Sequence, residues 1–288
     1  MNYVILGKSL KKGVSNDDSS SLSVYFELGW EVVGSRIDFI KLIKTGQIDS
    51  NNYIAVTSSD RVFFYSKIFD KVISYEEFQK IEIKNEDIVD DWTALKTIGN
   101  SNCFSFLDAK SFVDSNGKYI RYYQDYNEIF DGFDLSNVSI QKPEKYIVLG
   151  LRTRDHANHK NFQPTFFENL ICKLKENITT NIFVVGYGTE EFSKQNGCVY
   201  VEKLRDFVYL IKDKNRCVSY ITQSTGTALL SLICSEVPIH LLDHTGCSDL
   251  YGNNAVLGGK CIQFCKDEIF LHRTLNIETL NAIVNHYV

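Results

Sequence analysis

The chain has 288 residues, of which 44% are hydrophobic and 23% are charged, and these proportions exclude a disordered or fibrous protein. This length is about twice the ~150 residues of a typical domain, so two domains or one large domain are expected. Lys and Arg number 31 against 36 Asp and Glu, which gives a formal net charge of −5. The balance provides no overall basic field for phosphate contacts and disfavours nucleic acid as a partner.

The sequence contains no run of about 18 apolar residues, and its N-terminal segment turns polar after Leu6, too early for a signal peptide. We therefore expect a cytoplasmic protein without a transmembrane segment, and peripheral contact with a membrane stays open. Eight cysteines are scattered without a CxxC pair, and Cys172 and Cys234 lie in apolar helix-like runs. Buried thiols are expected there rather than disulfides or a zinc site.

In chain order, the first half alternates predicted strands and helices. An apolar run closed by a glycine at 2–7 predicts a buried strand, a polar loop follows at 8–21, and a helix is expected to begin near Ser21. Further elements are predicted as a helix at 37–43, a strand at 52–57, a helix at 61–69 behind capping residues 58–60, and a strand at 71–74. Residues 84–142 follow a less regular pattern, and we place a polar linker at about 136–144.

The second half repeats the alternation more regularly. Strands are predicted at 145–151, 181–186, 199–201, 217–221 and 238–242, and helices at 165–177, 204–212, 225–235 and 277–286. Two runs of βα units predict an α/β protein with two Rossmann-like lobes facing a central cleft, one at 1–140 and one at 145–288. Such proteins bind ligands at the carboxyl ends of their parallel strands.

The most distinctive motif joins a buried strand directly to an apolar helix through Gln223, Ser224, Thr225, Gly226 and Thr227. The free N–H groups and the positive dipole end of such a helix start favour an anion, and small hydroxyl residues let a phosphate come close. These five residues therefore form a candidate diphosphate site. In the alternative interpretation, Ser224 or Thr225 only caps the helix, and Gly226 only allows close packing on the sheet.

The order of a strand, a hydroxyl-Gly turn, an apolar helix, a Val-Pro strand and Asp243-His-Thr-Gly246 resembles the donor-binding half of GT-B glycosyltransferases, especially heptosyltransferases. In those enzymes the turn contacts the diphosphate of a nucleotide sugar, and the matching positions here are 224–227. The resemblance covers the two-lobe layout and about 100 residues of the second half. The chain departs from the pattern at Gln223, where an Asp is usual, and it lacks both a Pro-Met-His at the helix start and the Glu-rich signature of retaining enzymes.

A second candidate lies where the first strand of the C-terminal half ends. Arg152 and Arg154 alternate along that strand end, so one of them can present its planar guanidinium to a diphosphate. In the alternative, the arginine pairs with Asp155 in a surface loop. The position also resembles the strand-end arginines of GT-B fucosyltransferases. His156 and His159 nearby lack a carboxylate or cysteine at ligand spacing, so no metal site is expected.

A third group, Gly186 and Tyr187, follows the next strand of the C-terminal half, where this kind of fold commonly holds a nucleotide base. The Tyr187 ring either stacks on that base or simply packs in its loop. In the first half, the loop after the first strand carries Asp17 and Asp18. Either carboxylate can take the proton of an acceptor hydroxyl, and the alternative is an ordinary solvated turn.

Together these features predict a metal-independent glycosyltransferase of polysaccharide biosynthesis that uses no cofactor besides its nucleotide-sugar donor. It would move the sugar to a hydroxyl group of a glycan or glycoconjugate, with Arg152 or Arg154 and the helix-start amides stabilising the leaving diphosphate. Two alternatives stay open: an epimerase of nucleotide sugars with the same bilobal fold, and a two-lobed small-molecule binding protein. The sequence leaves the donor sugar, the acceptor and the stereochemical outcome open.

Overall fold

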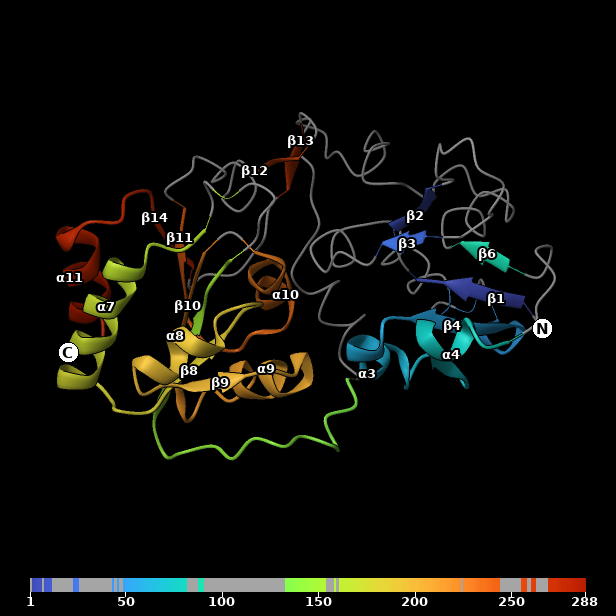
Figure 1. Ribbon diagram of the computed structural model, residues 1–288, viewed down its shortest axis with the longest axis horizontal. Coiled ribbons are helices and arrows are strands. Elements are labelled where there is room, and N and C mark those ends of the chain that lie inside the picture. Colours follow the sequence, from blue (N-terminus) through green and yellow to red (C-terminus); the bar gives the residue numbers. More distant parts are fainter. Residues whose placement is uncertain are drawn as a thin grey trace. The chain divides into compact units, whose positions relative to one another are not determined.

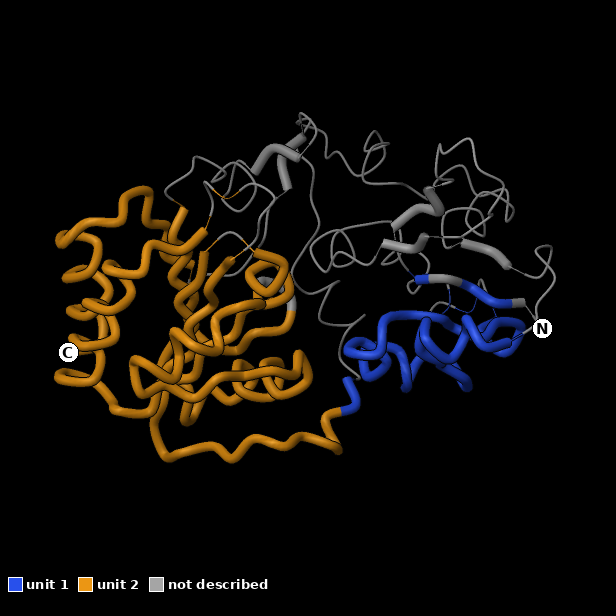
Figure 2. The backbone as a smooth tube through the Cα atoms, in the orientation of Figure 1, with its two compact units in different colours: residues 1–113, 128–134 blue, residues 114–127, 135–288 orange. Residues whose placement is uncertain are grey.

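The structure of the protein is a computed structural model, which describes residues 2–6, 8–11, 23–25, 43, 46, 49–81, 88–90, 133–153, 158, 161–223, 225–243, 255–257, 260–262 and 269–288. The chain divides into two compact units (Figure 2). Unit 1 comprises residues 1–113 and 128–134, and unit 2 comprises residues 114–127 and 135–288. Each unit has its own parallel β-sheet.

Unit 2 is built on a six-stranded sheet in which every neighbouring pair of strands is parallel (Figure 1). The strands are β7 (Tyr146–Gly150), β8 (Ile182–Val185), β9 (Val199–Val201), β10 (Cys217–Gln223), β11 (Ile239–Leu242) and β14 (Ile269–His272). Their order is β14-β11-β10-β7-β8-β9. All residues of β7, β8 and β11 are buried, and all but His240 are apolar or glycine, as is typical of strands covered on both faces.

Helices cover both faces of this sheet (Figure 1). They are α7 (Pro164–Asn177), α8 (Glu190–Gln195), α9 (Leu204–Ile211), α10 (Gly226–Cys234) and α11 (Ile277–Asn285). The helices α7 and α11 pack together on one face, where Leu280 and Ile221 join the same buried cluster. Successive strand residues point to opposite faces, so Tyr220 faces the other helices: its ring lies 5.1 Å from that of Phe207 in α9, and its hydroxyl donates to Thr227 of α10 (2.9 Å).

The connections of this sheet change direction between β7 and β10. From β7 the chain moves outward to β8 and β9, and it then crosses back to place β10, β11 and β14 on the other side of β7. The carboxyl ends of β7 and β10 therefore flank a topological switch point. Open α/β sheets bind their ligands at such points.

Unit 1 contains a smaller sheet, and its neighbouring strands are also parallel. Its elements are β1 (Asn2–Ile5), β4 (Tyr53–Thr57), β5 (Val72–Ser74) and β6 (Ile88–Asp90), with the short helices η1 (Ser50–Asn52), η2 (Ser59–Arg61), α3 (Val62–Tyr65) and α4 (Tyr75–Phe78). The strand order is β5-β4-β1-β6, so the switch point of these described strands lies between β1 and β6. Phe133 packs against Phe63 and Phe64 of α3, with ring centroids 5.9 and 4.9 Å apart.

The structure also corrects parts of the sequence prediction. The helix expected near Ser21 is wrong, because Ser23–Tyr25 forms β3, which pairs antiparallel with β2 (Lys8–Lys11) in the expected loop. The β-branched and aromatic residues of β3 favour a strand over a helix. A second antiparallel pair, β12 (Ala255–Leu257) with β13 (Lys260–Ile262), was not predicted. Cys234 is buried as expected, whereas Cys172 is exposed beside the apolar stripe of α7.

The connecting segment, residues 135–144, lies against α9 of unit 2. Ser139 donates both its backbone N–H and its hydroxyl to the buried Asp206 carboxylate, at 2.9 and 2.6 Å. Lys142 pairs with Asp213 at 3.0 Å and lies 3.5 Å from the centroid of the Tyr209 ring. Burial alone would raise the pKa of Asp213, but the hydrogen bond and charge of Lys142 hold it below its ordinary value. The segment is thus fixed to unit 2 by polar contacts.

Candidate functional site

The residues predicted to bind a diphosphate follow the two strands that flank the switch point of unit 2. Arg152 follows β7, while Gln223 ends β10 and leads through Thr225 into α10. These two strands are direct neighbours, with Gly150 opposite Thr222 in their register. The fold therefore brings Arg152 and the start of α10 to adjacent strand ends.

Hydrogen bonds to Gln223, Phe162 and Asn161 help to hold Arg152 in place. Its backbone N–H donates to Oε1 of Gln223 (3.3 Å), its carbonyl accepts from the N–H of Phe162 (2.9 Å), and its guanidinium Nη1 donates to Oδ1 of Asn161 (2.8 Å). Gln223 is only 1% exposed, so it supports the end of β7 from inside the protein. Arg152 itself is half-buried, and a charge in such a setting attracts an anion more strongly than one in bulk water.

The first turn of α10 offers backbone N–H groups to a ligand. Thr225 is the N-cap: its Oγ1 accepts from the N–H of Ala228 (3.1 Å) and lies 2.8 Å from Oγ1 of Thr227, which accepts from the hydroxyl of Tyr220 (2.9 Å). Both threonine hydroxyls are thus engaged within the protein, and the capping interpretation holds for Thr225. Within the described residues, the N–H groups of Gly226 and Thr227 have no hydrogen-bond partner, so they stay available to an anion.

Tyr187 stands at the tip of a turn after β8, and 84% of its surface is exposed. Gly186 (φ +154°) and Gly188 (φ +73°) flank it, and a Cβ on Gly186 would lie 2.1 Å from the carbonyl oxygen of Leu151. The hydroxyl of Thr153 donates to the carbonyl of Tyr187, which ties this turn to the loop after β7. An exposed aromatic ring on a constrained backbone is thus available for stacking at the same sheet edge.

The other predicted site residues, Arg154, Ser224, Asp17 and Asp18, lie outside the described residues, as do His156 and His159. The segment with Asp17 and Asp18 connects β2 to β3, the antiparallel pair that follows β1 in the chain, so it is not the direct continuation of β1 that the sequence suggested.

Three residues at the carboxyl edge of unit 2 were not predicted from the sequence: Asn161, Thr153 and Gly150. A Cβ on Gly150 would lie 2.2 Å from Oη of Tyr220, so the strand end requires a glycine there. In the sequence, a glycine at the end of a predicted strand could have indicated this close packing. Asn161 lies three positions before Pro164, the first residue of α7. The sequence predicted a helix start in this region but gave no indication of a role for Asn161.

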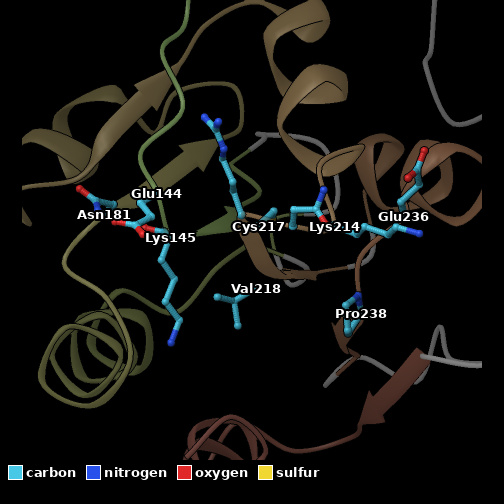
Figure 3. Close-up of a pocket in the computed structure, with 10 residues that line it drawn as sticks. Glu144, Lys145, Asn181, Lys214, Cys217, Val218, Glu236 and Pro238 are labelled. Atoms are coloured by element: carbon cyan, nitrogen blue, oxygen red, sulfur yellow. Dashed lines mark hydrogen bonds between the residues drawn. The ribbon is translucent and has the colours of Figure 1, made fainter.

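A hollow of about 910 Å³ lies at the opposite, amino edge of the same sheet (Figure 3). Its lining residues come from the segments before β7, β8, β10 and β11 and from the start of β10: Glu144, Lys145, Asn181, Lys214, Asn215, Arg216, Cys217, Val218, Glu236 and Pro238. The side chains of Lys145 and Glu236 point away from each other in Figure 3, and both are exposed. These two charged side chains in the lining of the hollow therefore do not converge on one point.

No three His, Cys, Asp or Glu side chains in the described part of the chain are placed to hold a metal ion. None of the helices in that part has the length and the apolar character needed to cross a membrane.

Comparison with solved structures identifies the architecture. The chain resembles the E. coli heptosyltransferase WaaC with ADP, with a TM-score of 0.51 and 11% sequence identity over 99% of this chain and 98% of that chain. The chain has the GT-B fold. It is also similar to the E. coli ADP-heptose LPS heptosyltransferase II, with a TM-score of 0.49 and 10% identity over 99% of both chains. No protein-family model and no curated protein matches the chain.

The GT-B fold confirms the fold class predicted from the sequence resemblance, with two Rossmann-like α/β units. One fold hosts many functions, so the architecture alone does not assign an activity. The function has to be argued from the groups at the strand ends.

Proposed function

We propose that the protein is a glycosyltransferase that moves a sugar from a nucleoside-diphosphate sugar to a hydroxyl group of a glycan or glycoconjugate. The observation that carries the proposal is the position of Arg152 and the start of α10 on both sides of the switch point between β7 and β10, in a chain with the GT-B fold. The WaaC structure was determined with ADP, so ADP-linked sugars are the first donors to test here.

In this proposal the donor diphosphate lies between Arg152 and the first turn of α10. The guanidinium and the N–H groups of Gly226 and Thr227 stabilise the charge that develops on the diphosphate as the bond to the sugar breaks. Arg154 and Ser224 follow the same two strands and add to this site. The exposed ring of Tyr187, at the next strand end beyond β7, stacks on the base of the nucleotide.

The proposed general base is Asp17 or Asp18 of unit 1. Its carboxylate accepts the proton of the acceptor hydroxyl while the hydroxyl oxygen forms a bond to the anomeric carbon, and the diphosphate leaves with the electrons of the broken C–O bond. This displacement inverts the anomeric configuration. Both residues lie in the sequence between β2 and β3, and this antiparallel pair follows β1, whose carboxyl end flanks the switch point of unit 1; that order along the chain supports the assignment.

The proposed reaction requires no metal ion, because Arg152 and the helix-start N–H groups supply the positive charge that a divalent cation gives to other transferases. We expect the activity to persist in excess EDTA. Loss of activity in EDTA with recovery on addition of Mn²⁺ or Mg²⁺ would contradict this part of the proposal.

The deciding experiment is product analysis with ADP-, UDP-, GDP- and CDP-linked sugars, with and without a glycan acceptor. A transferase releases nucleoside diphosphate in step with sugar incorporation into the acceptor. Conversion of the donor to a stereoisomer without release of diphosphate would identify an epimerase instead, and binding without turnover would identify a binding protein. Cell fractionation tests the cytoplasmic location that belongs to this proposal.

A further inference from the structure

A chain of hydroxyl groups runs from the core of unit 2 to the first turn of α10. The hydroxyl of Tyr220 donates to Oγ1 of Thr227 at 2.9 Å, and this oxygen lies 2.8 Å from Oγ1 of Thr225. Oγ1 of Thr225 also accepts from the backbone N–H of Ala228 at 3.1 Å. The chain therefore connects a fully buried side chain to two half-buried hydroxyls at the proposed diphosphate site.

The hydrogen bonds of the two threonines leave one hydroxyl proton unused. Each threonine hydroxyl has one proton to donate and can accept two hydrogen bonds. Thr227 accepts from Tyr220 at one end of the pair, and Thr225 accepts from Ala228 at the other end. The bond between the two threonines uses one of their two protons, whichever of them donates. In the part of the chain that the structure describes, the second proton has no acceptor, so it is available to a ligand.

Tyr220 is a fixed donor to this pair. Its ring lies 5.1 Å from that of Phe207, and burial raises the pKa of Tyr220, so its hydroxyl keeps its proton. Its Oη lies 2.2 Å from where a Cβ on Gly150 would be, so the missing side chain at the end of β7 makes room for the hydroxyl. Because Tyr220 occupies a lone pair of Thr227 from the inside, the unused proton of the pair is directed away from the core.

We propose that Tyr220 is a positioning residue, which holds the Thr225–Thr227 pair so that its unused hydroxyl proton is donated to the diphosphate of the sugar donor. This inference rests on the proposed function, because it takes a diphosphate as the ligand at the start of α10. The pair then adds one O–H group to the N–H groups of Gly226 and Thr227. A purely structural hydroxyl on Tyr220 would affect the stability of unit 2 and leave the affinity for diphosphate unchanged.

The test removes the Tyr220 hydroxyl and measures diphosphate affinity in the full-length protein by isothermal titration. The probes are ADP, UDP, GDP and CDP, and the one that the wild type binds most tightly is used throughout. Tyr220→Phe keeps the ring against Phe207 and removes only the hydroxyl. We expect it to weaken diphosphate binding roughly three- to tenfold, because the O–H of the threonine pair is no longer held toward the ligand. Unchanged affinity would overturn the inference.

The chain offers a matched control in β7. Tyr146 is also a fully buried tyrosine, and its hydroxyl donates to the backbone carbonyl of Leu210 in α9 at 2.9 Å. It is the first residue of β7, so it lies at the amino end of that strand. Tyr146→Phe should lower the thermal stability about as much as Tyr220→Phe and leave diphosphate affinity unchanged. An equal loss of affinity in both variants would indicate general destabilisation and overturn the inference.

Thr227→Val tests whether Tyr220 acts through the threonine pair. This variant keeps the side-chain shape and the backbone N–H, but it removes the link between Tyr220 and Thr225. It should weaken diphosphate binding at least as much as Tyr220→Phe, and Tyr220→Phe should then have no further effect in the Thr227→Val background. A further loss as large as that in the wild-type background would show that Tyr220 acts by another route, and would overturn the inference.

Arg152→Ala separates a failure of this inference from a failure of the proposed function. Loss of the arginine should weaken diphosphate binding ten- to a hundredfold. If Arg152→Ala weakens binding and Tyr220→Phe does not, the inference alone is overturned. If Arg152→Ala binds diphosphate as tightly as the wild type, or if the wild type binds none of the four diphosphates, the proposed site is overturned together with the inference that rests on it.

Discussion

The two edges of the unit 2 sheet carry different chemistry. At the carboxyl edge, glycines at Gly150 and Gly186 let the backbone pack closely, and Arg152 donates hydrogen bonds to the side-chain amide oxygens of Gln223 and Asn161. At the amino edge, long exposed side chains such as Lys145, Lys214 and Glu236 surround a hollow of about 910 Å³. The polar groups at the carboxyl edge are therefore held in position by packing and hydrogen bonds, whereas the amino edge has exposed charged side chains around an open hollow.

The difference explains why we propose the carboxyl edge, and not the hollow with its exposed charges, as the ligand site. A site needs groups that stay in one position while the ligand binds, because each side chain that must be ordered costs conformational entropy. The parallel sheet provides this at its carboxyl edge, where the loops and helix starts of adjacent strands meet. If function follows the carboxyl ends of the strands, changes there should have larger effects than changes at the amino edge.

The largest effect is expected at the proposed base of unit 1, in the segment between β2 and β3. Asn in place of the true base, at Asp17 or Asp18, should lower kcat by roughly 10²–10⁴-fold with little change in donor affinity, because the proposed donor site belongs to unit 2. Steady-state kinetics on both single variants, with thermal stability measured in parallel, provide the check. Near-normal kcat in both variants would exclude these carboxylates as the base.

A smaller effect is expected at the turn that carries Tyr187. Gly186→Ala places a Cβ 2.1 Å from the carbonyl oxygen of Leu151, so the turn must move. We expect the free energy of unfolding to fall by about 1–3 kcal/mol and nucleotide affinity to fall roughly tenfold as the Tyr187 ring shifts.

The matched control for this change is Gly197→Ala. Gly197 also has a positive φ, +57°, but its added Cβ would meet only the flexible end of Lys175, at 3.2 Å. This variant should lose about 1 kcal/mol of stability and keep its nucleotide affinity. Equal affinity losses in both variants would mean that the Gly186 effect arises from general destabilisation.

Low pH is expected to lower the stability of unit 2 through a histidine cluster on β11, β14 and the C-terminal residues. The ring of His240 in β11 contacts Nε2 of His272 at 2.9 Å and the hydroxyl of Tyr287 at 2.8 Å, and the ring of His286 lies 5.5 Å away. Burial, aided by His272 and His286, lowers the pKa of His240 from 6.5 to about 3. The unfolded chain therefore binds more protons than the folded protein below pH 6.5, and stability falls as the pH falls.

The expected loss from His240 alone is about 2 kcal/mol between roughly pH 8 and pH 5. Denaturant titrations at several pH values measure it, and His240→Phe should flatten the dependence because the ring remains but no longer titrates. A free energy of unfolding that is constant over this pH range would show that the cluster accepts a proton without loss of packing.

The smallest effect is expected at the amino edge. Lys214→Glu reverses a charge at the hollow, yet nucleotide affinity should stay within about twofold of the wild type, because exposed charges interact weakly through water. Isothermal titration with the best nucleoside diphosphate measures this. A tenfold change would place ligand binding at the hollow and reverse the comparison.

The strands β7 to β11 were predictable to within a few residues, because glycine, proline or polar residues flank each apolar run. The strand β14 escaped prediction, since Ile269–His272 is a run of four residues after a charged stretch and is only half-buried in the sheet. In unit 1, Ser-rich sequence suggested a helix cap where β3 forms instead. Local sequence patterns thus identified the buried strands. They did not identify β3 and β14, which are short strands that form by pairing with another strand.

The candidate site was predictable only at the level of strand ends. The parallel sheet predicted that Arg152 and Gln223 lie at the same edge. Their hydrogen bond could not be predicted, because it joins residues 71 positions apart. The histidine cluster similarly joins His240 to partners 32 and 47 positions away. Such contacts depend on side-chain directions in the packed protein, which no local spacing encodes.

The attachment of the connecting segment to α9 has a practical consequence for dissecting the protein. A fragment that starts at Lys145 would remove Ser139 and Lys142, and it would leave the carboxylate of Asp206, buried in the full chain, without the two hydrogen bonds that Ser139 donates. A fragment that starts at Leu135 keeps these contacts. Expression of the C-terminal half should therefore start before the connecting segment, because this segment is part of the folded structure of that half. Limited proteolysis should likewise leave the segment attached to that half.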